Sequence, residues 1–269
     1  MVVFPPCKIN LGLQITGKRA DGYHDVLTCF YPVPWCDILE AIPSQKFSFI
    51  GSGISIPGDI ADNLCTKAYS LLKKDFDLKP VALHLHKIIP TGAGLGGGSS
   101  DGAWTLRILN QLFNLDLTPE TLRQYASQLG SDCAFFIEDR PMLGSGRGEI
   151  LTDIAVNLKG KFIVIVKPDV HVSTAEAYAG VKPGAPEVAL KEILEKHPPE
   201  QWKDLVHNDF EASVFKKYPV IGKVKNLLYE HGAQYASMSG SGSAVFGIFT
   251  SSIDLKNIFE GYACYSGRL

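Results

Sequence analysis

A run of glycines between a predicted strand and a predicted helix constrains this chain more than any other feature. Residues 90–100 read PTGAGLGGGSS, so five of eleven positions are glycine. An apolar strand pattern covers residues 81–89, and a helical pattern runs from Ser99 or Ser100 to about Phe113. Because glycine allows positive φ and close backbone approach, N–H groups can converge beside the positive helix N-terminus. The segment therefore predicts a phosphate-binding loop, in which Ser99 and Ser100 add hydroxyls for phosphate or Mg²⁺.

Two familiar phosphate loops fit this segment poorly. The Walker pattern GxxxxGK[ST] is absent, because no lysine follows the glycines. Residues 92–97 do satisfy GxGxxG, the pattern of dinucleotide-binding folds, and Asp116 lies nineteen positions beyond Gly97. Asp116 directly precedes a helix start at Thr118 and Pro119, however, which leaves no room for the strand that carries the ribose-binding acid. A dinucleotide-dependent oxidoreductase is therefore the weaker interpretation.

The N-terminal segment places a lysine inside an apolar strand. Polar and apolar residues alternate over 8–15, which predicts a half-buried strand with Lys8 and Asn10 on one face. Leu11 and Leu13 follow on the other side of the alternation. A lysine in such a strand must extend to water, pair with an acid or bind a ligand. Lys8 is thus either a solvated edge residue or a member of a site.

Asp132 is an acidic residue with either a structural or a catalytic role. It follows a predicted helix that ends at Gly130 and directly precedes the apolar run CAFF. It either caps the next turn or is a carboxylate held by rigid neighbours, where a catalytic acid belongs. Lys8 and Asp132 both adjoin buried segments and can pair, although the sequence alone does not show that contact.

A second glycine-rich segment lies near the C-terminus. Residues 239–243 read SGSGS, between short predicted strands at 235–238 and 244–249. The segment is either a hairpin loop or a second set of backbone amides that faces the same phosphates.

Predicted strands and helices are mixed along the chain without strict alternation, which favours an α+β, two-layer fold over a doubly wound sheet. A composition change near 150–160 is the best candidate for a domain boundary, so we divide the chain at 155/156. Further strands are predicted at 26–33, 38–42, 47–50 and 162–166, a polar loop at 17–23, and helices at 63–76, 118–130, 188–197, 208–216 and 219–231.

Composition excludes several classes of protein. The chain has 269 residues and a net charge of −2, so no basic excess indicates a nucleic-acid or membrane partner. Its six cysteines form no CxxC pair, which favours reduced thiols over a disulfide framework. There is no signal-peptide pattern and no apolar run of the roughly 18 residues that a membrane helix needs. We therefore expect a cytoplasmic soluble protein.

Three motifs together resemble the GHMP kinases, a superfamily that includes galactokinase and the homoserine, mevalonate and phosphomevalonate kinases. They are the N-terminal strand PPCKINLGL, the loop PTGAGLGGGSS and the C-terminal stretch MSGSGSAVF, and they span residues 5 to about 249. The resemblance implies a GHMP kinase fold with two domains flanking a deep cleft. Residues 1–155 would carry the ATP-binding loop, and residues 156–269 would complete the substrate cleft.

The stretches TGKRADGYH and LGSDCAFF match one branch of this superfamily. In that branch Lys8 and Asp132 correspond to the catalytic pair, Tyr23 to a ring that stacks on cytosine, and His24 to a hydrogen-bonding partner of the base edge. The other positions that the resemblance implies are, for the nucleotide, Asn63, Lys87, Pro90, Gly92, Gly94, Leu95, Gly96, Gly97, Gly98, Ser99 and Ser100, and, for the substrate, Asn10, Thr174 and Tyr178.

The implied reaction is ATP-dependent phosphorylation of the 2-hydroxyl of a cytidyl-diphosphate derivative of methylerythritol, in non-mevalonate isoprenoid precursor synthesis. Mg²⁺ is expected with ATP, its protein ligands are not assigned, and the chain is expected to be a monomer or homodimer. Cys7, Ser131, Cys133 and Ala134 depart from the usual pattern but leave the charged residues in place. The alternatives are a mevalonate, homoserine or sugar kinase of the same superfamily and a non-enzymatic ligand-binding member.

Overall fold

The chain folds into two compact units that are both discontinuous in sequence. The structure is a computed structural model that describes residues 1–181, 183–184 and 189–269. Unit 1 comprises Met1–Cys7, Trp35–Thr91 and Gly96–Arg140, and unit 2 comprises Lys8–Pro34, Gly92–Leu95 and Pro141–Leu269. The glycine loop is therefore shared, because Gly92–Leu95 count with unit 2 and the residues on either side of them with unit 1.

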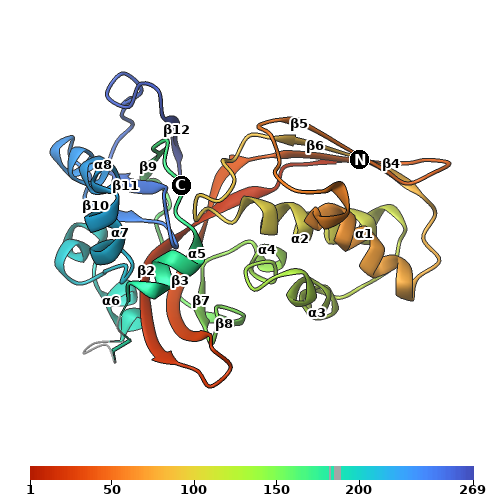
Figure 1. Ribbon diagram of the computed structural model, residues 1–269, viewed down its shortest axis with the longest axis horizontal. Helices are drawn as coiled ribbons and strands as arrows, with labels where there is room; N and C mark the ends of the chain where they lie inside the picture. Colours follow the sequence, from red (N-terminus) through yellow and green to blue (C-terminus); the bar gives the residue numbers. More distant parts are fainter. Residues whose placement is uncertain (182, 185–188) are drawn as a thin grey trace. The chain divides into compact units, whose positions relative to one another are not determined.

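Unit 1 is a four-stranded sheet with helices on one face (Figure 1). Its strand order is β1-β4-β6-β5, with β5 parallel to β6 and the other neighbours antiparallel. Burial alternates along β6, with its odd-numbered residues buried and its even-numbered residues more exposed, as expected for a sheet covered on one face. The strands are β1 (Val2–Val3), β4 (Ile38–Pro43), β5 (Ser48–Gly53) and β6 (Val81–Lys87), and the helices are α1 (Leu64–Asp75), α2 (Gly97–Leu112), α3 (Pro119–Leu129) and α4 (Phe135–Glu138).

Local signals explain where these helices begin and end. The Asn63 side chain accepts a hydrogen bond from the Cys65 N–H at 2.9 Å and so caps α1. Thr118 caps α3 by accepting from the Thr121 N–H, with Pro119 at the first helical position. The backbone N–H of Gly130 bonds to Ala126 and ends α3. These starts and ends confirm the helices predicted at 63–76 and 118–130.

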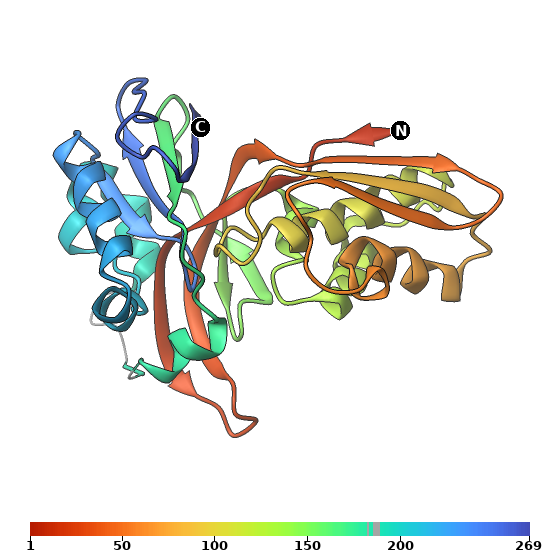
Figure 2. The same cartoon turned by 45° about the horizontal axis from the view of Figure 1, so that its top comes forward.

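Unit 2 contains two antiparallel sheets (Figure 2). One has the order β2-β3-β7-β8, and the other has the order β10-β11-β9-β12. The strands are β2 (Pro6–Lys18), β3 (His24–Cys36), β7 (Met142–Ser145), β8 (Ile150–Asp153), β9 (Phe162–Lys167), β10 (Tyr235–Met238), β11 (Val245–Phe249) and β12 (Ala263–Arg268), and the helices are α5 (Thr174–Ala179), α6 (Leu190–Lys196), α7 (Glu211–Lys217) and α8 (Pro219–Glu230).

The core of unit 2 joins segments from both ends of the chain. Leu13, Ile15 and Val26 from β2 and β3 are buried in one cluster with β9, β10, β11 and α8. Helices α7 and α8 cover one face of the second sheet in both views (Figures 1 and 2). Burial of this shared cluster is the main stabilising term for the unit.

The mixed helix-and-sheet architecture confirms the α+β prediction. The predicted strands and the helices at 208–216 and 219–231 are present within a few residues, and the loop predicted at 17–23 is shorter because β2 and β3 extend into it. The helix predicted at 188–197 appears as α6, although Val188 lies outside the described residues. Strands β1, β7, β8 and β12 and helices α4 and α5 were not predicted. They are short, or lack a clear period, so pattern alone does not reveal them.

All six cysteines are free thiols, as expected. Within the described ranges, no helix has the length and apolar character needed to cross a membrane.

Candidate active site

The glycine loop runs through alternate left-handed residues before α2 begins. Gly92, Gly94 and Gly96 have φ of +61°, +78° and +69°, conformations that cost a residue with a side chain roughly 1 kcal/mol or more. Gly96 is the N-cap of α2, which starts at Gly97, two residues earlier than predicted from Ser99. The glycine spacing therefore sets a backbone path that leads directly into a helix N-terminus, the arrangement that favours anions.

The two glycine-rich segments meet in unit 2. A Cβ on Gly94 would lie 1.9 Å from the Ser239 carbonyl oxygen, so glycine is required for the approach. The Ser239 hydroxyl donates to the Gly94 carbonyl at 2.9 Å, and the Ala244 N–H donates to the Ala93 carbonyl at 3.1 Å. Residues 239–243 are therefore more than a hairpin loop, because they pack against the first glycine loop and hydrogen-bond to it.

The Lys8 side chain, which projects from β2, contacts the same glycine loop. Its side chain is only 3% exposed, so the solvated edge-strand interpretation is wrong. Its ammonium donates to Asn10 Oδ1 at 2.7 Å and to the Gly94 carbonyl at 3.0 Å, and it lies 5.3 Å from the centre of the Phe30 ring. Asn10 is held in turn, since its Nδ2 donates to Thr28 Oγ1 at 2.9 Å. A buried cation thus contacts the backbone of the predicted phosphate loop.

The predicted base-binding residues also come together in unit 2. His24 at the start of β3 stacks on Tyr178 of α5, with ring centres 4.9 Å apart and planes 24° apart. Tyr23, the neighbour of His24, is 57% exposed, and the Arg147 guanidinium lies 5.1 Å from the centre of its ring. Thr174 begins α5, the helix that carries Tyr178. Two segments about 150 residues apart in sequence therefore meet at the His24–Tyr178 stack, next in the chain to the exposed Tyr23.

Asp132 belongs to unit 1, in the turns between α3 and α4. The N–H of Cys133 bonds to the Gly130 carbonyl and that of Phe136 to the Cys133 carbonyl, which fixes the backbone around it. Burial raises the pKa of the Cys133 thiol to about 12, so this neighbour stays protonated at neutral pH. Asp132 is the only carboxylate among residues 130–134. Its catalytic role stays a prediction.

Lys87 lies in a buried charge cluster that the sequence did not predict. Its ammonium, 2% exposed, donates to carboxylates of Asp37 and Asp101, the latter at 2.8 Å. Asp37 also accepts from the Ile88 and Ile89 N–H groups at 2.5 and 2.8 Å. Burial lowers the pKa of Lys87, but the two carboxylates outweigh it, so the pKa is raised and the lysine stays charged.

This cluster lies directly beneath the start of α2. A Cβ on Gly97 would be 2.8 Å from the Lys87 Nζ, which explains why glycine occupies this position. Two polar atoms near the start of α2, Ser100 Oγ and Asp101 Oδ1, are buried without a hydrogen-bond partner. Asn63 Oδ1, predicted to contact adenosine, caps α1. Nucleotide contacts by Asn63 and Lys87 stay predictions.

A metal held by protein groups alone finds no support in the described ranges, which contain no group of three His, Cys, Asp or Glu side chains able to hold an ion. The unpartnered Ser100 Oγ is suited to a different case, a hard cation that arrives with phosphates. Mg²⁺ bound mainly by nucleotide oxygens fits such a donor set.

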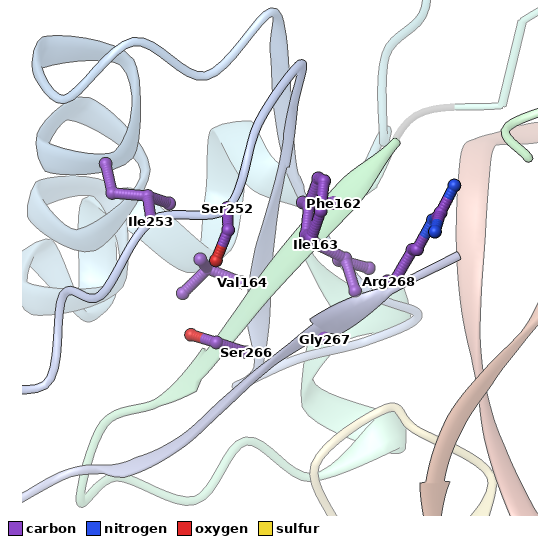
Figure 3. Close-up of a pocket in the computed structure, with 8 residues that line it drawn as sticks. All are labelled: Phe162, Ile163, Val164, Ser252, Ile253, Ser266, Gly267 and Arg268. Carbon is purple, nitrogen blue, oxygen red and sulfur yellow. The ribbon is translucent and has the colours of Figure 1, made fainter. Parts of the chain in front are cut away.

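One cavity of about 90 Å³ lies elsewhere in unit 2, along β9 and β12 (Figure 3). Its Arg268 side chain points away from the hydroxyls of Ser252 and Ser266. A ligand site usually needs roughly 300 Å³ and convergent polar groups, so we do not propose this cavity as a ligand site.

Two family descriptions match the chain on either side of the proposed boundary. "GHMP kinases N terminal domain" matches residues 63–139, and "GHMP kinases C terminal" matches residues 189–266. The chain therefore belongs to the GHMP kinases, a family that uses ATP.

Curated relatives extend the similarity over the whole chain. The 4-diphosphocytidyl-2-C-methyl-D-erythritol kinase of Bacteroides fragilis is 49% identical over 274 residues and covers 100% of both chains. The enzyme of the same name from Cytophaga hutchinsonii is 51% identical over 252 residues, 93% of each chain. Within the family, the chain groups with these kinases.

Solved structures agree. A crystal structure of 4-(cytidine 5'-diphospho)-2C-methyl-D-erythritol kinase is 33% identical, with a TM-score of 0.77 over 92% of this chain and 90% of that one. The mevalonate kinase of Methanococcus jannaschii has a TM-score of 0.71 over 100% of this chain and 98% of its own, at 16% identity. The latter likeness shows the shared fold alone.

Proposed function

We propose that this chain is an ATP-dependent kinase that phosphorylates the 2-hydroxyl of 4-diphosphocytidyl-2-C-methyl-D-erythritol, releasing ADP and the 2-phosphate. The reaction belongs to the non-mevalonate route to isoprenoid precursors. The observation that carries the kinase chemistry is the buried Lys8 ammonium, which bonds to the Gly94 carbonyl inside the glycine loop. The relatives at about 50% identity over the full chain support the choice of substrate.

The nucleotide is bound by the glycine loop and its flanks. Backbone amides at Gly94–Gly98 contact the β- and γ-phosphates, which need donors rather than covalent chemistry. Pro90 and Leu95 shape the loop, and Ser99 and Ser100 add hydroxyls. Asn63 and Lys87 contribute on the adenosine side.

Asp132 accepts the proton of the substrate hydroxyl as it becomes a nucleophile. The Lys8 ammonium, which bonds to the glycine loop at Gly94, offsets negative charge on the transferring phosphoryl group, because a cation stabilises charge most strongly where water is excluded.

The cytidine end orients the substrate. Tyr23 stacks on the base, His24 bonds to its edge, and Thr174 and Tyr178 line the same pocket, with Asn10 nearer the reacting alcohol. Binding energy from the base then fixes the distant hydroxyl for in-line attack.

Mg²⁺ accompanies ATP, with Ser100 Oγ as a candidate protein ligand, and when bound it neutralises charge on the phosphates. We further propose a cytoplasmic monomer or homodimer whose ligands are small molecules, with neither nucleic acid nor a membrane as partner.

A coupled assay of ADP release tests this function. The purified chain with ATP, Mg²⁺ and the cytidyl substrate should turn over at a rate well above that with mevalonate or homoserine. Preference for mevalonate, homoserine or a sugar would replace the proposed substrate with that alcohol. Absence of ADP release with every alcohol would favour the ligand-binding alternative.

A further inference from the structure

A short segment outside the three motifs holds the second glycine-rich segment in place. Residues 207–211 read HNDFE and connect to β2 through Leu13, whose N–H donates to the His207 carbonyl and whose carbonyl accepts from the Asp209 N–H, both at 2.9 Å. The Asp209 carboxylate accepts from the Ile15 N–H at 2.7 Å. The segment is thus fixed to a strand that also carries Lys8.

From this anchored position, Asn208 reaches the SGSGS segment. Its Nδ2 donates to the carbonyls of Met238 and Gly240, each at 2.8 Å, and its Oδ1 accepts from the Phe210 N–H at 3.0 Å. The side chain is 3% exposed, so water does not replace these bonds. Only an amide of this size supplies two donors and one acceptor here, because Asp lacks the donors and Leu lacks all three.

Glu211 holds the strand just before the same segment. Its Oε1 accepts from the Met238 N–H at 2.8 Å and from the Ser237 hydroxyl at 3.0 Å. Lys225 pairs with its other oxygen at 2.6 Å. Both sides of Met238 are therefore fixed, its N–H by Glu211 and its carbonyl by Asn208.

The bonds of Asn208 continue to the first glycine loop. Gly240, with φ of +55°, packs so closely that a Cβ would lie 3.3 Å from the Gly94 Cα. Between Met238 and Gly240 is Ser239, whose hydroxyl donates to the Gly94 carbonyl beside the Lys8 ammonium. Fixing the two carbonyls on either side of Ser239 consequently fixes the contact between the loops.

We propose that Asn208 is a positioning residue for nucleotide phosphates: it acts through residues 238–240 on the glycine loop at Gly94 and on Lys8. This inference rests on the proposed kinase function but not on the identity of the alcohol. It assigns to the HNDFE segment a role that its position outside the glycine motifs does not suggest.

Three variants test it: Asn208→Ala, the smaller change Asn208→Ser, and the matched control Asp209→Asn. The control alters the adjacent carboxylate but keeps an acceptor for the Ile15 N–H. Each is assayed for kcat and for KM of ATP and of the alcohol, and each is titrated calorimetrically with a non-hydrolysable ATP analogue. Circular dichroism and thermal unfolding identify the folded fraction.

We expect Asn208→Ala to weaken analogue binding and raise KM for ATP by about tenfold, since two buried carbonyls lose their donors. We expect the KM for the alcohol to stay within about twofold in every variant and Asp209→Asn to match the wild type. Asn208→Ser should give an intermediate effect and serves if the alanine variant does not fold.

Analogue affinity and ATP KM within about twofold of wild type in a folded Asn208 variant would overturn the proposal, because a purely structural residue lowers stability without changing them. An equal loss in Asp209→Asn would also overturn it. A wild-type chain that binds the analogue yet fails to phosphorylate the cytidyl substrate would defeat the proposed function instead, and the binding comparison would still decide the role of Asn208.

Discussion

Single buried polar residues of this chain have sharply different numbers of partners. Asp37 accepts three hydrogen bonds in the cluster around Lys87, whereas Asp101 accepts one from the same ammonium and leaves Oδ1 without a partner. Burial raises the pKa of Asp101 to about 7, with Asp37 adding to the shift and Lys87 opposing it. Asp37 and Asp101 face the same ammonium, but we expect them to contribute unequally to the free energy of unfolding.

Asp37→Asn should cost about 3 kcal/mol of unfolding free energy, because an amide donor would face the Lys87 ammonium and leave it with the Asp101 carboxylate as its only charged partner in the cluster. Asp101→Asn should cost under about 1 kcal/mol, since Lys87 keeps Asp37 and a buried excess of negative charge is removed. Urea denaturation at neutral pH measures both. Equal losses would show that the two carboxylates are equivalent.

The same carboxyl makes stability depend on pH. The folded chain holds a proton on Asp101 up to about pH 7, whereas an unfolded aspartate releases it near its ordinary value of 3.8. The folded state therefore binds more protons in this window, and this group's contribution to stability falls as pH rises from about 4 to 7. Denaturation at pH 5 and pH 8 should show wild type losing stability relative to Asp101→Asn; a constant difference would contradict this.

Asp132→Asn should lower kcat by about 10²–10⁴ and leave substrate affinity largely unchanged, as expected when a general base is lost. Steady-state kinetics with the cytidyl substrate measures this, and substrate binding by calorimetry is the control. Full activity of the variant would remove Asp132 from the mechanism.

Tyr23→Ala should raise KM for the cytidyl substrate through loss of roughly 1–3 kcal/mol of stacking. The Tyr23 ring is 57% exposed, and the stack of His24 on Tyr178 would remain in place. The KM for ATP should not change. If the KM for the cytidyl substrate does not change either, the base binds elsewhere.

At the scale of elements, the glycine loop and α2 form one unit of backbone geometry. Three glycines with positive φ set the backbone path that leads into the N-terminus of α2. Gly97, without a Cβ, leaves room for the Lys87 ammonium. By contrast, a Cβ on Gly98 would meet no atom within 4 Å. The five positions of the loop therefore differ in how strictly they need glycine.

Gly94→Ala should abolish binding of an ATP analogue and lower unfolding free energy by more than about 2 kcal/mol, because its Cβ would meet the Ser239 carbonyl at 1.9 Å. Calorimetry and thermal unfolding measure these effects. Gly98→Ala is the control for stability and should unfold like wild type. Normal stability and affinity in the Gly94→Ala variant would show that the loops do not need this approach.

For the whole molecule, the order of segments in space does not follow their order in the chain. The boundary predicted at 155/156 falls between the two family matches, yet unit 2 takes residues 8–34, 92–95 and 141–155 from the N-terminal part. Leu13, Ile15 and Val26 pack into the core that β9, β10 and β11 build. The segment after 155/156 therefore lacks part of its own hydrophobic core.

A chain of residues 156–269 alone should consequently show no cooperative unfolding transition, since its core lacks these N-terminal side chains. Circular dichroism during heating tests this, with the full chain as control. A sharp transition of the fragment near that of the full chain would establish 156–269 as an autonomous domain.

Sequence patterns were enough to predict the α+β class and most strand and helix positions, which the fold confirms, and a phosphate-binding loop at residues 90–100, whose ligand stays a prediction. These features depend on glycine conformation, on side-chain period and on caps such as Thr118, all of which act within a few residues. The bond of Lys8 to Gly94, the stack of His24 on Tyr178 and the position of Lys87 between Asp37 and Asp101 became visible only in the folded chain. Those partners are 14 to 154 positions apart, and packing of the complete fold rather than any local preference brings them within a few ångströms.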